Sequence, residues 1–582
     1  MYEPTQVEPP KTNNKKMYYI GGAVLAGLLL LCCCVVVVVI VVVDPFKLNL
    51  INRLTGRGDP ITKVVSPNAV VYMGVDLLNT TPQKLDRLIK PFQEALKDTN
   101  VQDTQSAQNE LDKQLQEYNM TIKDDIVPWI GQYAGVGVTS LEMDEYGSFS
   151  QASFVIAVES RNAKAADAFL VKLQDGISKS SGSNFIQQTY QGVNIAVLDA
   201  SASEKVVLCR SGGLILISQD EQDIQDAIDL QKKGGSLGEQ ANYKAIVNQL
   251  PAGRSITFYM NGAEYLKLYE SLLGSMGSTM EGIPIDMEKF GLWTDAAFSL
   301  SVVDAGLQMD TVVAYDLAKL SANTQQMIQS AGKANATAKM FPEGTLFYAN
   351  GQRLDLLWLS IQDMMTGTNL SDFKESMTML EQQIGVNPDT DIFPYMNGEY
   401  ALGIFPSGEG LLSAQANIDL GFALLVWTSD PQKMGEAVTA VNTSLSDMNL
   451  PIQDVDAGGY TLYEISDPST NDLVLAYGMQ KEYLVIGSSS NAVKDFANQS
   501  KSLENSLAYQ QVWNAFPKGR APVFYMDFQG FMGAIREVAG LTGSETFDQD
   551  TAVLDPITAI AAGATPLKGN TASSTIIIFI KK

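Results

Sequence analysis

The sequence SLGEQANYKAIVNQLPAGRSITFYM, residues 236–260, recurs as SLENSLAYQQVWNAFPKGRAPVFYM at residues 502–526, and this duplication indicates how the chain is organised. The two copies align without a gap and share a Tyr, a Pro-x-Gly-Arg turn and a closing Phe-Tyr-Met. A proline and glycine turn followed by β-branched and aromatic residues is typical of a loop that enters a β-strand. Repetition over this length indicates that the chain contains one structural unit twice.

Matches in the same order surround this block. DIVPWIGQYAGVGV, from Asp125, corresponds to DIFPYMNGEYALGI, from Asp391, and SPNAVVYMGVD, from Ser66, corresponds to FPEGTLFYANG, from Phe341. We therefore expect two homologous domains in tandem. The expected segments are a tail at 1–16, a transmembrane helix at 17–43, a linker at 44–63, repeat domain 1 at 64–320, a linker at 321–338 and repeat domain 2 at 339–582.

Each copy alternates short strand patterns with amphipathic segments. In the first copy, Gly192 separates the strand-like runs IQQTY and VNIAVL, as in a β-hairpin. Residues 163–173 and 220–230 have helical spacing of apolar side chains. Because turns join most neighbouring strands, we expect an α+β fold in each copy, a mainly antiparallel sheet with helices packed on it.

The apolar stretch from Met17 to Val43 contains no charged residue and no proline. It is longer than the roughly 20 residues that a helix needs to cross a bilayer, and too long for a cleaved signal peptide. We expect it to be an uncleaved transmembrane helix, so the lipid bilayer is a partner of the chain. Lysines and arginines are balanced on its two sides, so charge alone leaves the orientation open.

The composition excludes several classes of function. The chain has a formal net charge of −25, which disfavours binding to nucleic acid. It contains no histidine, which excludes Ser-His-Asp and Cys-His catalysis and histidine metal sites. Cys209 is the only cysteine beyond the apolar stretch, so the domains are expected to fold without an internal disulfide.

The order of the motifs resembles one known family. A proline-led strand near Tyr72 is followed by the Asp-Ile-x-Pro-aromatic element and by the late Tyr…Pro-x-Gly-Arg…Phe-Tyr-Met block. Together with the N-terminal anchor, these motifs are similar to those of a bacterial envelope family catalogued as a domain of unknown function (three-three-five-two). The resemblance implies a single-pass protein of the cell membrane with its N-terminus in the cytoplasm and most of the chain outside. It brings no known reaction, cofactor or catalytic residue.

Arg254 and Arg520 occupy the repeated Pro-x-Gly-Arg turn. An arginine can bind a carboxylate or phosphate with two hydrogen bonds, so both are candidate ligand-binding positions. The alternative is a structural clamp in which each arginine bonds to its own turn.

Aromatic residues form the second group of candidate positions. Trp129 and Tyr395 follow the repeated Asp-Ile-x-Pro, and Tyr133 and Tyr400 follow in turn. They could line a ligand site, or fill a buried corner between helix and sheet.

Asp-x-Asp pairs are the remaining candidates for metal binding. Asp389 with Asp391, and Asp548 with Asp550, could bind calcium, but neither pair continues into a calcium-binding loop. Aspartate also caps turns and helices. We therefore expect no metal and no other cofactor.

These observations favour a membrane-tethered extracytoplasmic binding or scaffolding protein without catalytic activity, whose partner is an envelope protein. A carrier or sensor of a small apolar or lipid ligand, held between sheet and helices, is the alternative. A hydrolase that uses carboxylates or a Ser-Lys pair would need a titratable cluster in one site.

Overall fold

The computed structural model describes residues 58–77, 82–96, 113, 115–116, 118–143, 149–198, 205–275, 293–364, 367–407, 419–469, 473–494, 501–541, 547 and 551–581. The predicted tail and transmembrane helix lie outside the described residues. Within the described residues, no helix combines the length and the apolar character needed to cross a bilayer.

The chain forms two compact units, which are described separately. Unit 1 comprises Met1–Leu85, Gln102–Met143 and Ser148–Ala241, and unit 2 comprises Asp86–Val101, Asp144–Gly147 and Asn242–Lys582. The division near residue 241 falls inside the first predicted repeat domain.

In unit 1, the described strands form one antiparallel sheet in the order β1-β2-β3-β7-β6-β5-β4. The strands are β1 (Val71–Asp76), β2 (Ile130–Met143), β3 (Phe149–Ser160), β4 (Phe185–Tyr190), β5 (Val193–Leu198), β6 (Val207–Ser211) and β7 (Leu214–Ser218). The helices are η3 (Pro60–Lys63), η4 (Ile122–Ile126), α4 (Ala163–Ser181), α5 (Glu221–Lys233) and η5 (Leu237–Glu239).

The hairpin predicted at Gly192 is present between β4 and β5. Gln191 and Gly192 both have positive φ, of 48° and 77°, the combination that a two-residue type I′ turn requires. Glycine adopts this conformation without steric cost, which is why the sequence marks the turn so clearly.

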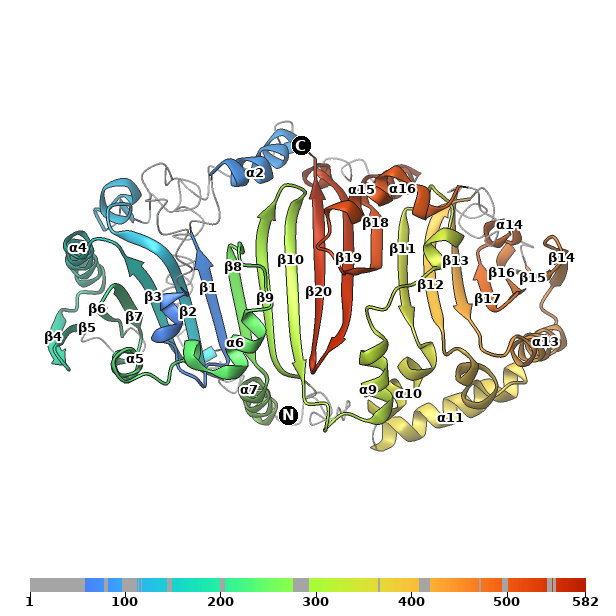
Figure 1. Cartoon of the computed structure of the whole chain (residues 1–582), viewed down its shortest axis with the longest axis horizontal. Helices are drawn as coiled ribbons and strands as arrows, with labels where there is room; N and C mark the ends of the chain where they lie inside the picture. Colours follow the sequence, from blue (N-terminus) through green and yellow to red (C-terminus); the bar gives the residue numbers. More distant parts are fainter. Residues whose placement is uncertain are drawn as a thin grey trace, which may run out of the picture. The chain divides into compact units, whose positions relative to one another are not determined.

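In unit 2, the described strands form an antiparallel sheet in the order β8-β9-β10-β20-β19-β18-β11-β12-β13-β17-β16-β15-β14 (Figure 1). The strands before residue 430 are β8 (Ile256–Asn261), β9 (Trp293–Val303), β10 (Gly306–Tyr315), β11 (Phe347–Gln352), β12 (Glu399–Pro406) and β13 (Leu420–Trp427). The later strands are β14 (Ile452–Asp456), β15 (Thr461–Ser466), β16 (Leu473–Gln480), β17 (Tyr483–Gly487), β18 (Ala521–Asp527), β19 (Ile557–Lys568) and β20 (Thr571–Ile580).

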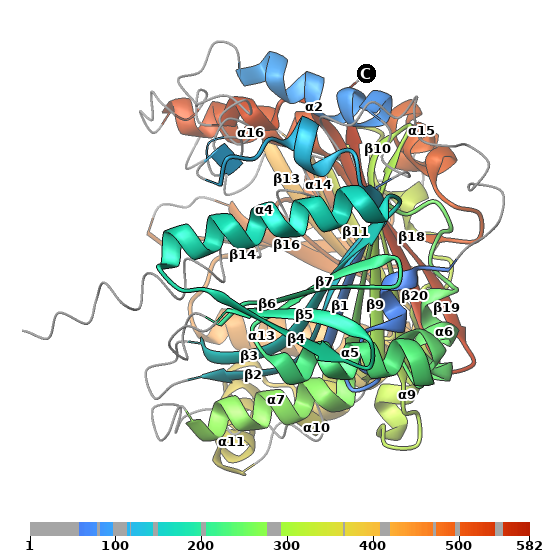
Figure 2. The same ribbon diagram turned by 90° about the vertical axis from the view of Figure 1, so that its left-hand side faces the viewer.

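Helices accompany this sheet on both sides. Those before residue 385 are α2 (Pro82–Leu96), α6 (Ala241–Val247), α7 (Gly262–Ser275), α9 (Ala322–Ser330), η7 (Thr337–Met340), α10 (Leu354–Met364) and α11 (Gly367–Ile384). Most residues of α2 and of α6 belong to unit 2. The later ones are η8 (Pro388–Ile392), η9 (Phe393–Tyr395), α13 (Pro431–Asp447), α14 (Ser490–Val493), η11 (Leu503–Asn505), α15 (Leu507–Ala515), α16 (Phe528–Leu541) and η12 (Ala552–Leu554). Figure 2 shows α6 and α15 on one side of the sheet and α7 and α16 on the other.

The two copies of the repeated block build equivalent packing. Tyr243 of α6 meets Tyr259 of β8 edge to face, with ring centroids 5.0 Å apart. Tyr509 of α15 meets Tyr525 of β18 in the same way, at 5.1 Å. The order β1-β2-β3-β7-β6-β5-β4 is also that of β11-β12-β13-β17-β16-β15-β14. The prediction of an α+β fold with a mainly antiparallel sheet is confirmed.

Gly403 on β12 is a position where the core of unit 2 has no room for a side chain. A Cβ there would lie 2.4 Å from the ring of Phe341, which is 0% exposed. We expect Gly403→Ala to lower the free energy of unfolding by about 1–3 kcal/mol through overpacking, as measured by urea titration.

The control is Gly435→Ala in α13, where a Cβ would meet nothing within 4 Å. It is expected to raise the free energy of unfolding by about 0.5–1 kcal/mol, since alanine loses less backbone entropy in a helix. Equal effects of the two substitutions would contradict the packing described here.

Candidate functional site

Arg254 bonds to its own turn. Its Nε donates to Thr257 Oγ1 at 2.6 Å and its Nη1 donates to the carbonyl oxygen of Pro251 at 2.8 Å. These bonds hold the loop where it enters β8. Arg254 therefore acts as a structural clamp on its own turn.

Arg520 takes a different position at the equivalent turn. Its side chain crosses β19 beside Gly563 and donates from Nη1 to Ser573 Oγ of β20 at 2.6 Å. Burial lowers the pKa of this half-buried guanidinium, and the charge of Asp310 acts in the opposite direction. Arg520 therefore contributes to a polar network inside the sheet.

Asp310 of β10, whose charge acts on Arg520, is only 2% exposed. Its carboxylate accepts hydrogen bonds from Thr575 Oγ1 at 2.6 Å and from Gln308 Nε2 at 2.8 Å. Cross-strand pairing places Ser299 of β9 directly opposite Asp310, and the buried hydroxyl of Ser299 has no hydrogen-bond partner among the described residues. The buried face of the sheet is thus polar near the pairing of β10 with β20.

The Asp-Ile-x-Pro-Trp element of unit 1, residues 125–129, begins in the last two residues of a short π-helix, η4. Asp125 closes the turn, because its Oδ2 accepts from the backbone N–H of Thr121 at 2.8 Å. Trp129 is 3% exposed, donates from Nε1 to the carbonyl of Asp125 at 2.7 Å and lies 4.9 Å from the ring of Phe169. This tryptophan fills a buried corner.

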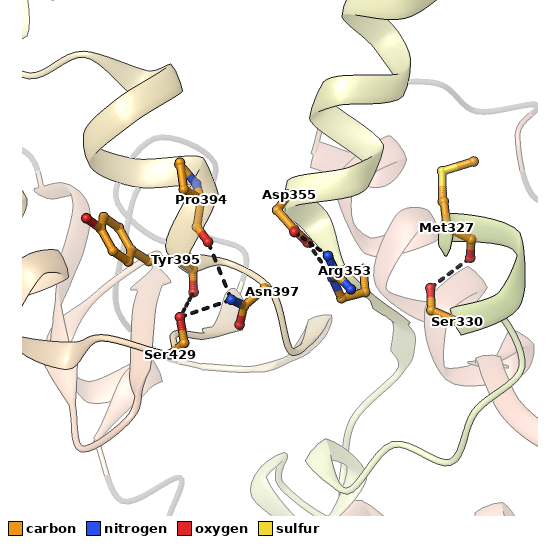
Figure 3. A network of polar contacts seen from close by, with 8 residues as sticks. All are labelled: Met327, Ser330, Arg353, Asp355, Pro394, Tyr395, Asn397 and Ser429. Atoms are coloured by element: carbon orange, nitrogen blue, oxygen red, sulfur yellow. Dashed lines mark hydrogen bonds and ion pairs between the residues drawn. The ribbon is translucent and has the colours of Figure 1, made fainter. Parts of the chain in front are cut away.

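The equivalent element of unit 2 has the same backbone role. Asp391 accepts from the backbone N–H of Asn387 at 2.9 Å, within η8. The carbonyl of Tyr395 accepts from the backbone N–H of Ser429 at 2.9 Å, while its ring is turned away from Asn397 and Ser429 (Figure 3). The ring packs, half-buried, against the apolar cluster around Met434.

Tyr133 and Tyr400 are half-buried strand residues. The backbone N–H of Tyr133 donates to Glu159 Oε2 at 3.2 Å. The hydroxyl of Tyr400 lies over Gly351, where a Cβ would come within 2.4 Å of it, and burial raises the pKa of this phenol. Tyr133 and Tyr400 lie near the starts of β2 and β12, whereas Trp129 directly precedes β2 and Tyr395 is the last residue of η9.

Sequence analysis missed the ion pair between Arg353 and Asp355. Arg353 has a positive φ of 63° and donates from Nε and Nη2 to the two carboxylate oxygens of Asp355, at 2.9 and 2.7 Å (Figure 3). The hydrogen bond to Asp355 raises the pKa of Arg353. Its backbone N–H donates to the carbonyl of Gly398, so the pair fixes the start of α10 against the loop before β12.

The candidate metal ligands Asp389 and Asp391 accept hydrogen bonds from other groups of the protein. Asp389 accepts from Trp358 Nε1 at 2.6 Å and from Gln362 Nε2 at 2.8 Å, and Asp391 closes its own turn. Asp548 and Asp550 lie outside the described residues. Among the residues that the structure describes, no group of three or more Asp, Glu or Cys side chains is arranged to hold a metal ion.

The feature of unit 2 that stands out is an open apolar face of the sheet. Met309, Ile576 and Leu402 are 40%, 37% and 36% exposed although they lie on inner strands. They belong to one cross-strand row in which each residue pairs with the next. The row is Leu300, Met309, Ile576, Ala562, Phe524, Ala349, Leu402 and Leu424.

A second row runs beside the first on the same face. It consists of Val302, Leu307, Ile578, Ile560, Met526, Phe347, Ile404 and Phe422. Every position in the two rows is apolar, and each is half-buried or exposed. We call these two rows the open face. Leu402 and Leu424 have counterparts in unit 1, Val136 and Ile156, which are buried at 6% and 2% exposed.

Polarity is inverted on β10, one of the strands that form the open face. On β10, the polar Gln308 and Asp310 are buried, at 8% and 2% exposed, while Leu307 and Met309 are turned to the open face. A sheet with one solvated face normally places apolar residues inward and polar residues outward. Large exposed apolar surfaces typically mark sites of interaction. Chemically, the open face can bind apolar groups, and it offers no acid, base or metal ligand.

Comparisons with known proteins find one matching family and a remote similarity to solved structures. The profile of a family described as "Protein of unknown function (DUF3352)" matches residues 23–580. Three crystal forms of TP0453 (I, IV and III) are similar at 12%, 11% and 14% sequence identity, with TM-scores of 0.23, 0.24 and 0.21. The matches cover 48%, 44% and 48% of this chain and 88%, 81% and 89% of those chains. Similarity this low carries no functional inference. No curated protein matches the chain.

Proposed function

The chain belongs to the DUF3352 family of proteins of unknown function, and we propose that it is a membrane-tethered, non-catalytic binding protein that holds lipid acyl chains on its open face. The observation that carries the proposal is the inverted polarity of β10. A strand that buries an aspartate and a glutamine while turning leucine and methionine outward is adapted to an apolar neighbour.

The chemistry of the open face narrows the class of ligand. Its two rows contain aliphatic, methionine and phenylalanine side chains, which gain free energy by covering apolar surface and offer no hydrogen bonds. Acyl chains have the same character. The net charge of −25 disfavours an anionic head group, so a zwitterionic lipid is the expected ligand class.

Two features of the sequence support the remaining parts of the proposal. The absence of histidine supports binding rather than catalysis. The apolar stretch from Met17 to Val43 is suited to anchor the chain in the cell membrane, with the N-terminus in the cytoplasm and the residues after the anchor outside. A tether of this kind keeps an acyl-binding surface close to its source of lipid.

Photolabelling of the full chain tests the proposal. The chain is reconstituted in vesicles of zwitterionic lipid that contain a diacyl lipid with a diazirine on one acyl chain. After illumination, mass spectrometry of peptides is expected to locate labels in β10, β20 and β12, besides the expected anchor. Met309→Gln is expected to lower labelling of β10 and β20 about fivefold, since roughly 1 kcal/mol of apolar contact is lost.

Met379→Gln is the matched control, because Met379 of α11 is 52% exposed and lies off the open face. The extent of labelling of β10 and β20 in Met379→Gln should equal that of the wild type. Labels confined to residues 17–43, or a loss of labelling that is equal in the two variants, would refute acyl binding on this face. A protein cross-linked there in native envelopes, without lipid label, would instead support the scaffolding alternative.

A further inference from the structure

The strand β4 forms a free edge of the sheet in unit 1. Within the part of the chain that the structure describes, β5 is the only strand that pairs with β4. Residues 186–189 of β4 are exposed, and Ile186 is 49% exposed. The strand, FIQQTY, contains no charged residue and no proline, two of the features that usually protect a free edge from further pairing. The edge is therefore open to another β-strand.

The hairpin of β4 and β5 determines which backbone groups point away from β5. Its two-residue turn makes Tyr190 and Val193 a hydrogen-bonded pair, and bonded and non-bonded pairs alternate from there along the strands. The opposite strand agrees, because Leu198, which pairs with residue 185, donates its N–H to the carbonyl of Val206 at 2.9 Å and not to β4. Residues 185, 187 and 189 of β4 therefore direct their N–H and carbonyl groups outward, where they can form a further antiparallel ladder.

The equivalent edge strand of unit 2 is protected by charge. This strand is β14, IQDVD, and cross-strand pairing identifies its Asp454 as the counterpart of Gln187. The pairs in unit 1 connect, in order, Ile156, Ile217, Leu208, Ala196 and Gln187. The pairs in unit 2 connect Leu424, Ile486, Tyr477, Tyr463 and Asp454. Like charges directly opposite each other are destabilising, so two copies of β14 are disfavoured from pairing about Asp454, whereas β4 has an uncharged amide at this position.

We propose that β4 pairs with β4 of a second copy of this chain, antiparallel about a twofold axis through Gln187. Residues 185, 187 and 189 then lie opposite residues 189, 187 and 185 of the second copy, so every outward group is used and about six backbone hydrogen bonds form. The uncharged edge suits self-association of a chain with a net charge of −25, because no carboxylate of β4 meets its own copy. The expected anchor confines the copies to one membrane and raises their effective concentration.

Hydrogen–deuterium exchange of the full chain, resolved to single residues, tests this inference. The chain is compared in vesicles that hold many copies and in nanodiscs that hold one copy. In vesicles, the N–H groups of residues 185, 187 and 189 are expected to exchange at least about tenfold more slowly than in single-copy nanodiscs, because hydrogen bonding protects amides. The N–H groups of residues 186, 188 and 190, which face β5, should be protected in both samples and report that the hairpin is folded. Equal exchange of residues 185, 187 and 189 in the two samples would overturn the inference.

Variants of residue 187 test the register and the identity of the partner strand. Gln187→Asp places two carboxylates opposite each other, so residues 185, 187 and 189 should exchange in vesicles at their single-copy rates. Gln187→Asn keeps the strand uncharged and should retain slow exchange. Asn68→Asp is the charge-matched control, since Asn68 is exposed in the loop before β1, and it should also retain slow exchange. Slow exchange in Gln187→Asp, or a benzophenone side chain at residue 187 that cross-links outside β4 of the second copy, would contradict the pairing of β4 with itself.

Discussion

Replacing Ile576 by aspartate is expected to lower acyl-chain labelling of β10 and β20 at least tenfold while leaving the protein folded. Ile576 pairs with Met309 and is 37% exposed on the open face, so the new carboxylate faces solvent in the free protein. An acyl chain bound there would remove that charge from water, and an unpaired buried charge costs several kcal/mol. Each 1.4 kcal/mol is a tenfold change in affinity.

The measurement is competition between photoreactive and unlabelled lipid on the full chain, combined with urea titration. Ile576→Thr separates polarity from charge and preserves β-propensity, so it should show a smaller loss. Wild-type labelling in Ile576→Asp, with an unchanged urea midpoint, would show that acyl chains do not contact this row.

Removing the buried carboxylate of Asp310 is expected to lower the free energy of unfolding by about 3 kcal/mol. Asp310→Ala leaves the hydroxyl of Thr575, which is 0% exposed, and the amide of Gln308 without their acceptor. Hydrogen bonds to a charged acceptor contribute about 1.5–3 kcal/mol each, and relief of the buried charge offsets part of that loss. Arg520 also loses the charge that favours its protonated form.

Equilibrium urea unfolding measures this effect. The control is Asp304→Ala, since Asp304 is 87% exposed in its pair with Arg87 and should leave the unfolding midpoint unchanged. If Asp310→Ala matches that control, the buried network does not hold β10 to β20. The double variant Asp310→Ala with Thr575→Val should recover part of the stability, because it removes the orphaned hydroxyl.

Much of the fold was predictable because local rules determine it. Gly192 requires a turn with positive φ, and the hairpin of β4 and β5 follows. Asp220 caps α5, whose observed span of Glu221–Lys233 overlaps the helical pattern in the sequence. The repeated block produces the same Tyr-on-Tyr packing of α6 on β8 and of α15 on β18.

The open face was not predictable from its strands. The segment GLQMDTVVAY alternates, but alternation does not state which set of side chains is buried. The ordinary rule would bury Leu307 and Met309 and expose Gln308 and Asp310, the opposite of what the structure shows. The inversion depends on the pairing of β10 with β20, which lies more than 250 residues along the chain.

The candidate arginines illustrate the same limit. Their identical Pro-x-Gly-Arg context predicted equivalent roles, whereas Arg254 bonds within its own turn and Arg520 reaches Ser573 two strands away. The difference arises beside Arg520, where β18 packs against Gly563 of β19. Gly563 has no side chain, and this leaves space for the side chain of Arg520. Such a difference in packing is not visible in the repeat itself.

Quantitative lipid mass spectrometry on the purified full chain tests acyl binding by the open face most directly. Wild-type protein and the Ile576→Asp and Met379→Gln variants are purified in identical nanodiscs without a photoreactive lipid. The samples are washed, and the lipid is then extracted. The proposal predicts an excess of zwitterionic diacyl lipid, about one per chain, for the wild type and for Met379→Gln, and its loss in Ile576→Asp. Equal lipid content in all three proteins would contradict it.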